Sequence, residues 1–119
     1  MLFPRFRSRE RDLRSDVERL SIVEQAVNRA IADAESELIG LGKRLEDARA
    51  RAAFLYGDVI DGETERDRES NELVDSAERF LVRGERRREE LKSHFEVLYD
   101  LRRRVSDAMK GLAADGAED

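Results

Sequence analysis

The sequence predicts an all-α fold, a long antiparallel helical hairpin of the coiled-coil type, which we expect to dimerise into a four-helix bundle. Two observations carry this prediction. Apolar residues recur with heptad spacing from Val17 to Leu55 and again from Leu73 to Leu112. Charged residues make up 43% of the chain and aromatic residues only 6%, a composition typical of long helices. The 119 residues have room for one domain.

The first predicted helix covers residues 15–56. Its apolar positions advance in alternating steps of three and four residues, as a coiled-coil seam requires, and only Glu24 interrupts them. The repeat passes unbroken through the Gly-Leu-Gly stretch at residues 40–42, so we expect one helix here. Ser8 and Ser15 are both candidates for the cap at its start, because a serine hydroxyl accepts a hydrogen bond from a first-turn N–H.

The remaining segments follow from composition. Residues 57–62 contain Gly, Asp and Gly and are predicted to form the turn. The second helix is predicted over residues 63–113, followed by a disordered acidic tail at residues 114–119. Residues 1–14 form a basic and aromatic N-terminal arm. A turn centred near residue 60 pairs residues whose numbers add up to about 120, which predicts Leu38 opposite Leu81 and Ala34 opposite Gly84.

The apolar stripes are wider than a two-helix seam needs, which predicts packing against further helices. The side chains that we expect to contact a partner are Phe3, Phe6, Ile22, Val23, Phe54, Val59, Ile60, Phe80, Phe95 and Tyr99.

The N-terminal arm has two interpretations. Its phenylalanines can cover Met109 and Leu112, which extend beyond the start of the first helix. They can also dock in an acidic groove or touch an anionic membrane surface, because arginines are interleaved with them. The predicted turn at residues 57–62 also has two interpretations. It can simply cap the helices, or its acidic residues can form the tip of a hairpin that enters a partner, the shape used by factors that enter the secondary channel of RNA polymerase.

One alternative function is enzymatic. Glu69, Glu72 and Asp75 have helical spacing, and all-α nucleotide pyrophosphatases hold Mg²⁺ with such carboxylates. Arginines on the facing stretch, Arg44 among them, are expected to pair with these carboxylates, which favours a salt-bridged surface instead. His94 is the only histidine, and we expect it at a seam position, in a polar layer with Glu24, Asn28, Arg87 and Arg88 that fixes the pairing.

The rest of the sequence narrows the function classes. No cysteine, signal peptide or membrane-length apolar stretch is present, which predicts a cytoplasmic location. The net charge of −5 argues against general nucleic-acid binding. We expect no catalytic, cofactor-binding or metal-binding residues. The predicted function is that of a non-enzymatic coiled-coil adaptor or assembly component, such as an accessory subunit of a larger bacterial machine.

Overall fold

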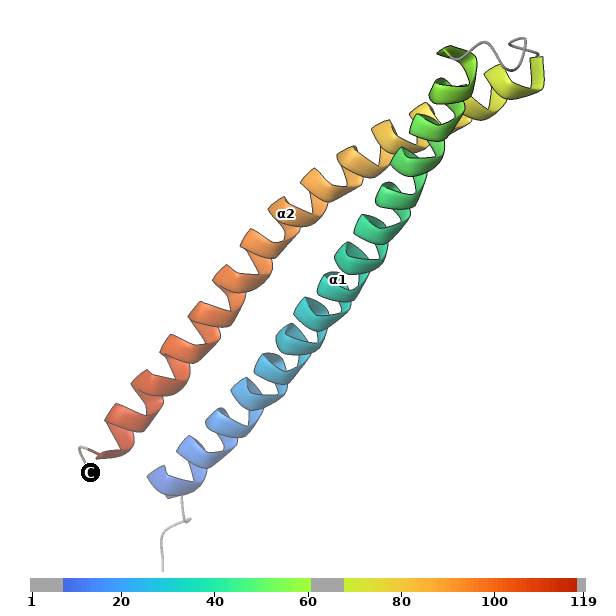
Figure 1. The fold of residues 1–119 in the computed structure, drawn as a ribbon. Helices are drawn as coiled ribbons and strands as arrows, with labels where there is room; N and C mark the ends of the chain where they lie inside the picture. Colours follow the sequence, from blue (N-terminus) through green and yellow to red (C-terminus); the bar gives the residue numbers. More distant parts are fainter. Residues whose placement is uncertain (1–7, 61–67, 118–119) are drawn as a thin grey trace, which may run out of the picture. The chain divides into compact units, whose positions relative to one another are not determined.

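Two helices make up the described part of the chain (Figure 1). The computed structural model describes residues 8–60 and 68–117, in which α1 spans Arg9–Ile60 and α2 spans Arg68–Ala117. They contain 52 and 50 residues. The predicted all-α helical hairpin is confirmed for these residues, and the glycines at residues 40–42 and Gly84 interrupt neither helix. Dimerisation stays a prediction.

Ser8 caps the start of α1. The Ser8 hydroxyl accepts a hydrogen bond from the Arg11 N–H at 3.2 Å, and the Ser8 carbonyl accepts one from the Asp12 N–H at 3.0 Å. Glu10 and Asp12 stand in the first turn, where the positive end of the helix dipole favours them. The helix therefore includes residues that the sequence assigns to the arm. Phe3 and Phe6 lie outside the described residues.

The C-terminal end of α1 differs from the prediction. The helix continues through Gly57 to Ile60, so the predicted turn is wrong for these residues. A glycine inside a helix costs only about 1 kcal/mol relative to alanine, and the Tyr56 hydroxyl fastens this stretch by donating a hydrogen bond to the Glu78 carboxylate of α2. The side chains of Val59 and Ile60 lie outside the description, as do residues 61–67.

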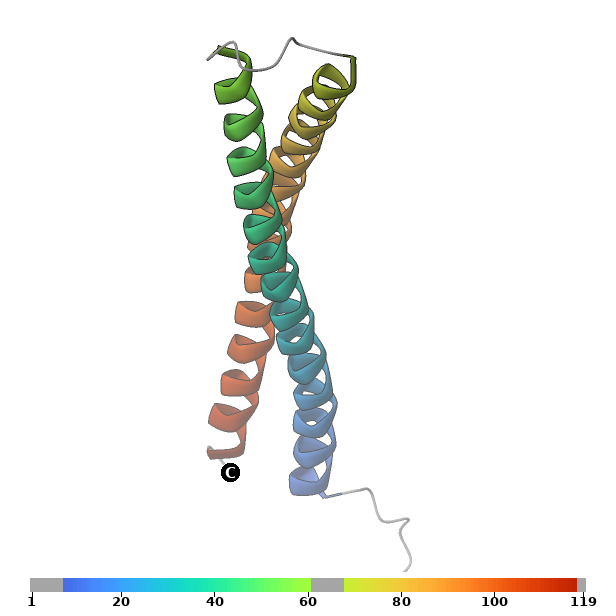
Figure 2. The same ribbon diagram turned by 45° about the vertical axis from the view of Figure 1, so that its right-hand side comes forward.

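The chain divides into two units. Unit 1 comprises residues 1–33 and 95–119, and unit 2 comprises residues 34–94. In each unit a segment of α1 packs against a segment of α2 that runs in the opposite direction (Figures 1 and 2). The seam residues supply the core of both units, as the heptad repeat predicts. Those that are buried are Ile31, Ala34, Leu41, Leu45, Ala52, Val74, Leu91, Phe95, Leu98 and Val105.

Close contacts at two glycines define how the helices pair. In unit 2 a Cβ atom on Gly84 would lie 3.1 Å from Leu45 Cγ, and in unit 1 a Cβ atom on Gly116 would lie 3.5 Å from Leu13 Cδ1. In both pairs the residue numbers add up to 129. Within each unit, this sum brings seam residues of α1 opposite seam residues of α2, as an antiparallel coiled coil requires.

The predicted pairing is therefore wrong by ten to eleven residues, about three helical turns. Gly84 lies against Leu45 rather than Ala34, and the register places Leu38 opposite Leu91 rather than Leu81. The cause is the position of the connection between the helices. Because α1 ends at Ile60 and α2 begins at Arg68, the connection is centred near residue 64 rather than residue 60.

Candidate interaction surfaces

Exposed apolar side chains gather on one side of unit 1. An ion pair in unit 2 indicates which residues of α1 and α2 lie side by side at this position of the heptad. There, Arg87 of α2 binds Glu37 of α1 across the seam. The numbers of these two residues add up to 124, and each follows a seam position by three residues, Ala34 on α1 and Gly84 on α2. Val23 and Leu101 have the same heptad position and the same sum. The register therefore places Val23 beside Leu101 in unit 1.

We call the resulting surface the unit 1 apolar face and define it by Ile22, Val23, Ala26, Val97 and Leu101. Its four large side chains each expose between 43% and 67% of their surface. Val23 and Ala26 lie one turn apart on α1, and Val97 and Leu101 lie one turn apart on α2. In a chain so rich in charge, five uncharged residues in this arrangement form a second, shorter apolar stripe on each helix.

Charges of both signs border this face. On α1 the Arg19 guanidinium lies 3.0 Å from the Asp16 carboxylate, and on α2 the Arg104 guanidinium lies 3.1 Å from the Asp100 carboxylate. Each pair joins residues of one helix and is largely exposed to solvent. The border of the face is therefore close to neutral and offers both an acid and a base on each helix.

Two aromatic residues of α2 that the sequence predicts to contact a partner, Phe95 and Tyr99, belong to unit 1. Neither is part of the unit 1 apolar face. Phe95 exposes only 8% of its surface because it packs in the seam of unit 1 itself. Tyr99 remains partly exposed, and its ring stacks on Phe95 with 5.7 Å between centroids. The Arg102 guanidinium lies 5.0 Å above the Tyr99 ring. Tyr99 is thus held by its own helix, and Phe95 lies within the core of unit 1, not on its surface.

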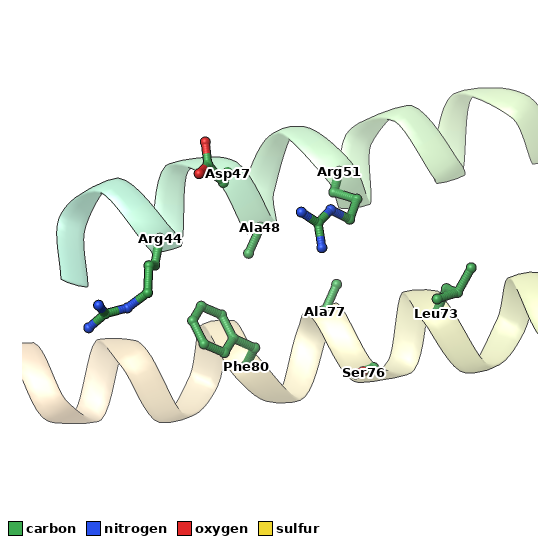
Figure 3. A pocket seen from close by; sticks show the side chains of 8 residues that line it. All are labelled: Arg44, Asp47, Ala48, Arg51, Leu73, Ser76, Ala77 and Phe80. Atoms are coloured by element: carbon green, nitrogen blue, oxygen red, sulfur yellow. The ribbon is translucent and has the colours of Figure 1, made fainter. Parts of the chain in front are cut away.

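Unit 2 contains a groove between its two helices, with a volume of about 330 Å³. Figure 3 shows the Phe80 ring and Ala77 projecting from α2 toward Ala48 of α1, with the Arg51 guanidinium above Ala77. The Asp47 carboxylate points away from the groove (Figure 3). The full lining consists of Arg44, Asp47, Ala48, Arg51, Leu73, Ser76, Ala77 and Phe80.

The predicted role of the arginines around this groove is not what the structure shows. Arg49 pairs with Glu85 of α2. Arg44 and Arg51 make no ion pair within 4.0 Å among the described residues, and both are exposed. The Arg44 guanidinium instead lies along its own helix, 3.6 Å from the position of a Cβ atom on Gly40. The groove is therefore bordered by two arginines that form no ion pair with a carboxylate of the described residues.

On the same side of unit 2, Arg87 and Glu37 form a two-bond ion pair. The guanidinium Nε and Nη2 atoms donate to the two carboxylate oxygens of Glu37 at 2.6 and 2.9 Å. These hydrogen bonds lower the pKa of Glu37 below its ordinary value, although desolvation acts in the opposite direction. Arg44 contributes a weaker attraction to the same carboxylate.

The acidic stretch proposed for metal binding has few described members. Glu72 and Asp75 are exposed and make no ion pair with the described residues, and the side chain of Glu69 lies outside the description. Among the described residues, no group of three or more His, Cys, Asp or Glu side chains is placed to hold a metal ion.

The predicted seam position of His94 is wrong. His94 is exposed and lies beside the seam residue Phe95 rather than in the seam. Glu24 does occupy a seam position, where it is half-buried and the register of unit 1 places it opposite Val105. Arg87 binds Glu37 within unit 2.

Of the other predicted partner-binding residues, Phe54 in unit 2 is 69% exposed and Phe80 is half-buried in the groove. Sequence analysis missed Val97 and Leu101 in unit 1 and Leu73 in unit 2. Their heptad positions next to the seam were the signal that could have identified them.

Neither helix, as far as the structure describes them, has an apolar stretch of the length that crossing a membrane requires. The chain matches no protein-family model, no curated protein and no solved structure.

Proposed function

We propose that the protein is a non-enzymatic helical interaction module that self-associates through the unit 1 apolar face, so that two hairpins form a four-helix bundle there. The observation that carries the proposal is the second apolar stripe on each helix of unit 1. A helix in a two-stranded coiled coil needs one stripe, whereas a helix in a four-helix bundle packs against two neighbours. Ala26 favours this packing because a small side chain lets another helix approach closely.

The border charges support a second copy as the occupant. Asp16 with Arg19, and Asp100 with Arg104, present both signs on each helix. A two-fold copy meets such a border with the same set of charges and can offer an opposite charge to each of them. Two-fold dimers of this isologous kind are the commonest oligomers of soluble proteins.

Sedimentation equilibrium tests this proposal. Wild type is expected to be a dimer, and the Val23→Glu/Leu101→Glu variant a monomer at the same concentrations, because two carboxylates would be buried in the interface. The matched control is Ile39→Glu/Val82→Glu, which adds two charges at exposed apolar positions of unit 2 and should remain dimeric. Circular dichroism of each variant checks that the helices are retained.

A wild-type chain that stays monomeric at every concentration contradicts the proposal. So does a Val23→Glu/Leu101→Glu variant that associates as strongly as the control.

A further inference from the structure

The groove of unit 2 has an apolar floor that the hairpin does not cover. Ala48 of α1 and Ala77 of α2 face each other across it, and Phe80 fills one part of it (Figure 3). Leu73 borders the groove and exposes 51% of its surface. Small residues at the centre with larger apolar residues beside them leave room for the side chains of a partner.

Two cations stand on the α1 border of this floor. Arg44 and Arg51 are separated by seven residues, which is about 10 Å along a helix axis. Asp47 lies between them in sequence, but its carboxylate points away from the groove (Figure 3) and forms no ion pair among the described residues. Other arginines of unit 2, such as Arg49 and Arg87, have carboxylate partners on the facing helix.

We propose that this groove binds an acidic amphipathic helix of a partner protein, with two carboxylates spaced seven residues apart that pair with Arg44 and Arg51. Leucines at the third and fourth positions after the first carboxylate would lie on the same side of such a helix and would contact Ala48, Ala77 and Phe80. Charge complementarity selects this occupant, because the groove border is basic although the whole chain carries a net charge of −5.

The inference rests on the proposed function as an interaction module, and it names the class of partner. It uses a surface of unit 2, whereas self-association uses the unit 1 apolar face. The two proposals can therefore fail separately.

The test uses the full chain and a fluorescein-labelled, alanine-based helical peptide with Glu at positions i and i+7 and Leu at i+3 and i+4. A second peptide has Gln in place of both Glu residues. In fluorescence anisotropy titrations, the Glu peptide should bind about tenfold more tightly than the Gln peptide, because two charge-assisted contacts are lost in the latter. The Arg44→Glu/Arg51→Glu variant should lose at least that factor for the Glu peptide.

The matched control is Arg79→Glu/Arg86→Glu, which makes the same change of charge at two exposed arginines of α2. This control should bind the Glu peptide within about twofold of wild type, because its arginines lie outside the groove lining. Equal binding of the two peptides to wild type overturns the inference. An equal loss in both variants also overturns it, since general attraction to an acidic peptide then explains the binding.

Sedimentation of the Arg44→Glu/Arg51→Glu variant separates this inference from the proposed function. We expect it to self-associate like wild type. If self-association weakens with the loss of these arginines, a second copy occupies the groove and the inference of an acidic partner helix is wrong. If the chain is monomeric but the Glu peptide binds as described, the proposed self-association is wrong and the inference of an acidic partner helix is supported.

Discussion

The two units are built from the same two helices but bury their seams to different degrees. In unit 2, Leu45, Val74 and Leu91 are at most 1% exposed. In unit 1 the best-buried seam residue, Ile31, retains 4%, and Glu24 occupies a seam position. The helices of unit 2 are also joined by ion pairs across the seam, whereas the ion pairs bordering the apolar face of unit 1 lie within one helix.

This difference teaches that unit 2 completes its seam within the hairpin, whereas unit 1 does so less fully. Unit 2 buries the seam residues Leu45, Val74 and Leu91 and joins its helices by cross-helix ion pairs, while apolar side chains outside its seam, such as Phe54 and Val82, remain exposed. Unit 1 leaves Ile22, Val23, Val97 and Leu101 exposed beside a less complete seam. A second copy on the unit 1 apolar face would supply the burial that unit 1 lacks, at about 25 cal/mol for each Å² of apolar surface removed from water.

The largest expected difference between the units comes from deleting one leucine in each. Leu45→Ala removes a fully buried side chain of unit 2 and should lower the free energy of unfolding by about 2–5 kcal/mol. Leu101→Ala removes a half-exposed side chain of unit 1 and should cost less than about 1 kcal/mol in the monomer. Urea denaturation in dilute solution measures both. Equal losses would contradict the difference in burial.

A smaller effect is expected at the two leucine–glycine contacts. Gly84→Ala forces the buried Leu45 side chain to move, which costs about 1–3 kcal/mol and outweighs the gain of about 1 kcal/mol in helix propensity. Gly116→Ala places its methyl group at an ordinary contact distance from Leu13, and it should be nearly neutral because Gly116 stands in the last turn of α2, where helix propensity contributes little. The matched control in unit 2 is Gly42→Ala, which meets no atom within 4 Å and should stabilise the chain.

Thermal unfolding followed by circular dichroism ranks these three variants. A Gly84→Ala variant as stable as Gly42→Ala would show that the two helices of unit 2 do not approach each other closely at this point.

The smallest effect concerns the cross-helix ion pair of unit 2. Because Arg87 lowers the pKa of Glu37 in the folded state, the pair stabilises the fold above the ordinary pKa of a glutamate. This contribution is lost as the pH falls through the folded-state pKa. The Glu37→Gln variant should therefore be slightly less stable than wild type at neutral pH, with the difference shrinking in acid. Unfolding free energies measured over a pH series test this.

Glu35→Gln is the control for that series, since Glu35 is an exposed residue of unit 2 that forms no ion pair among the described residues. A pH-independent difference between wild type and Glu37→Gln would mean that Arg87 does not act on this carboxylate.

The sequence was sufficient for the fold but not for the register. Heptad spacing determines which residues of each helix form the seam, and the residues found buried all come from it. A seam that repeats along each helix, however, brings apolar residues opposite one another in more than one register. The position of the connection decides between the registers, and it was misplaced because Gly57 continues the helix instead of ending it.

The surfaces were predicted only in part, for a related reason. Ile22, Val23 and Phe54 are exposed as their positions outside the seam predict. Phe95 is buried because it belongs to the seam of α2, a fact that only the correct heptad assignment of α2 reveals. Arg44 and Arg51 were expected to pair with carboxylates of α2 and do not among the described residues, since which arginines find a carboxylate depends on the register.

The central claim is that a second copy covers the unit 1 apolar face. Because the chain contains no cysteine, single thiols can be introduced as reporters by Val23→Cys in unit 1 and Val82→Cys in unit 2. The rate of thiol alkylation is measured at increasing protein concentration. The claim predicts that the rate for Val23→Cys falls as the protein associates, while the rate for Val82→Cys stays constant. A rate for Val23→Cys that does not depend on concentration, in a chain that nevertheless dimerises, would contradict it.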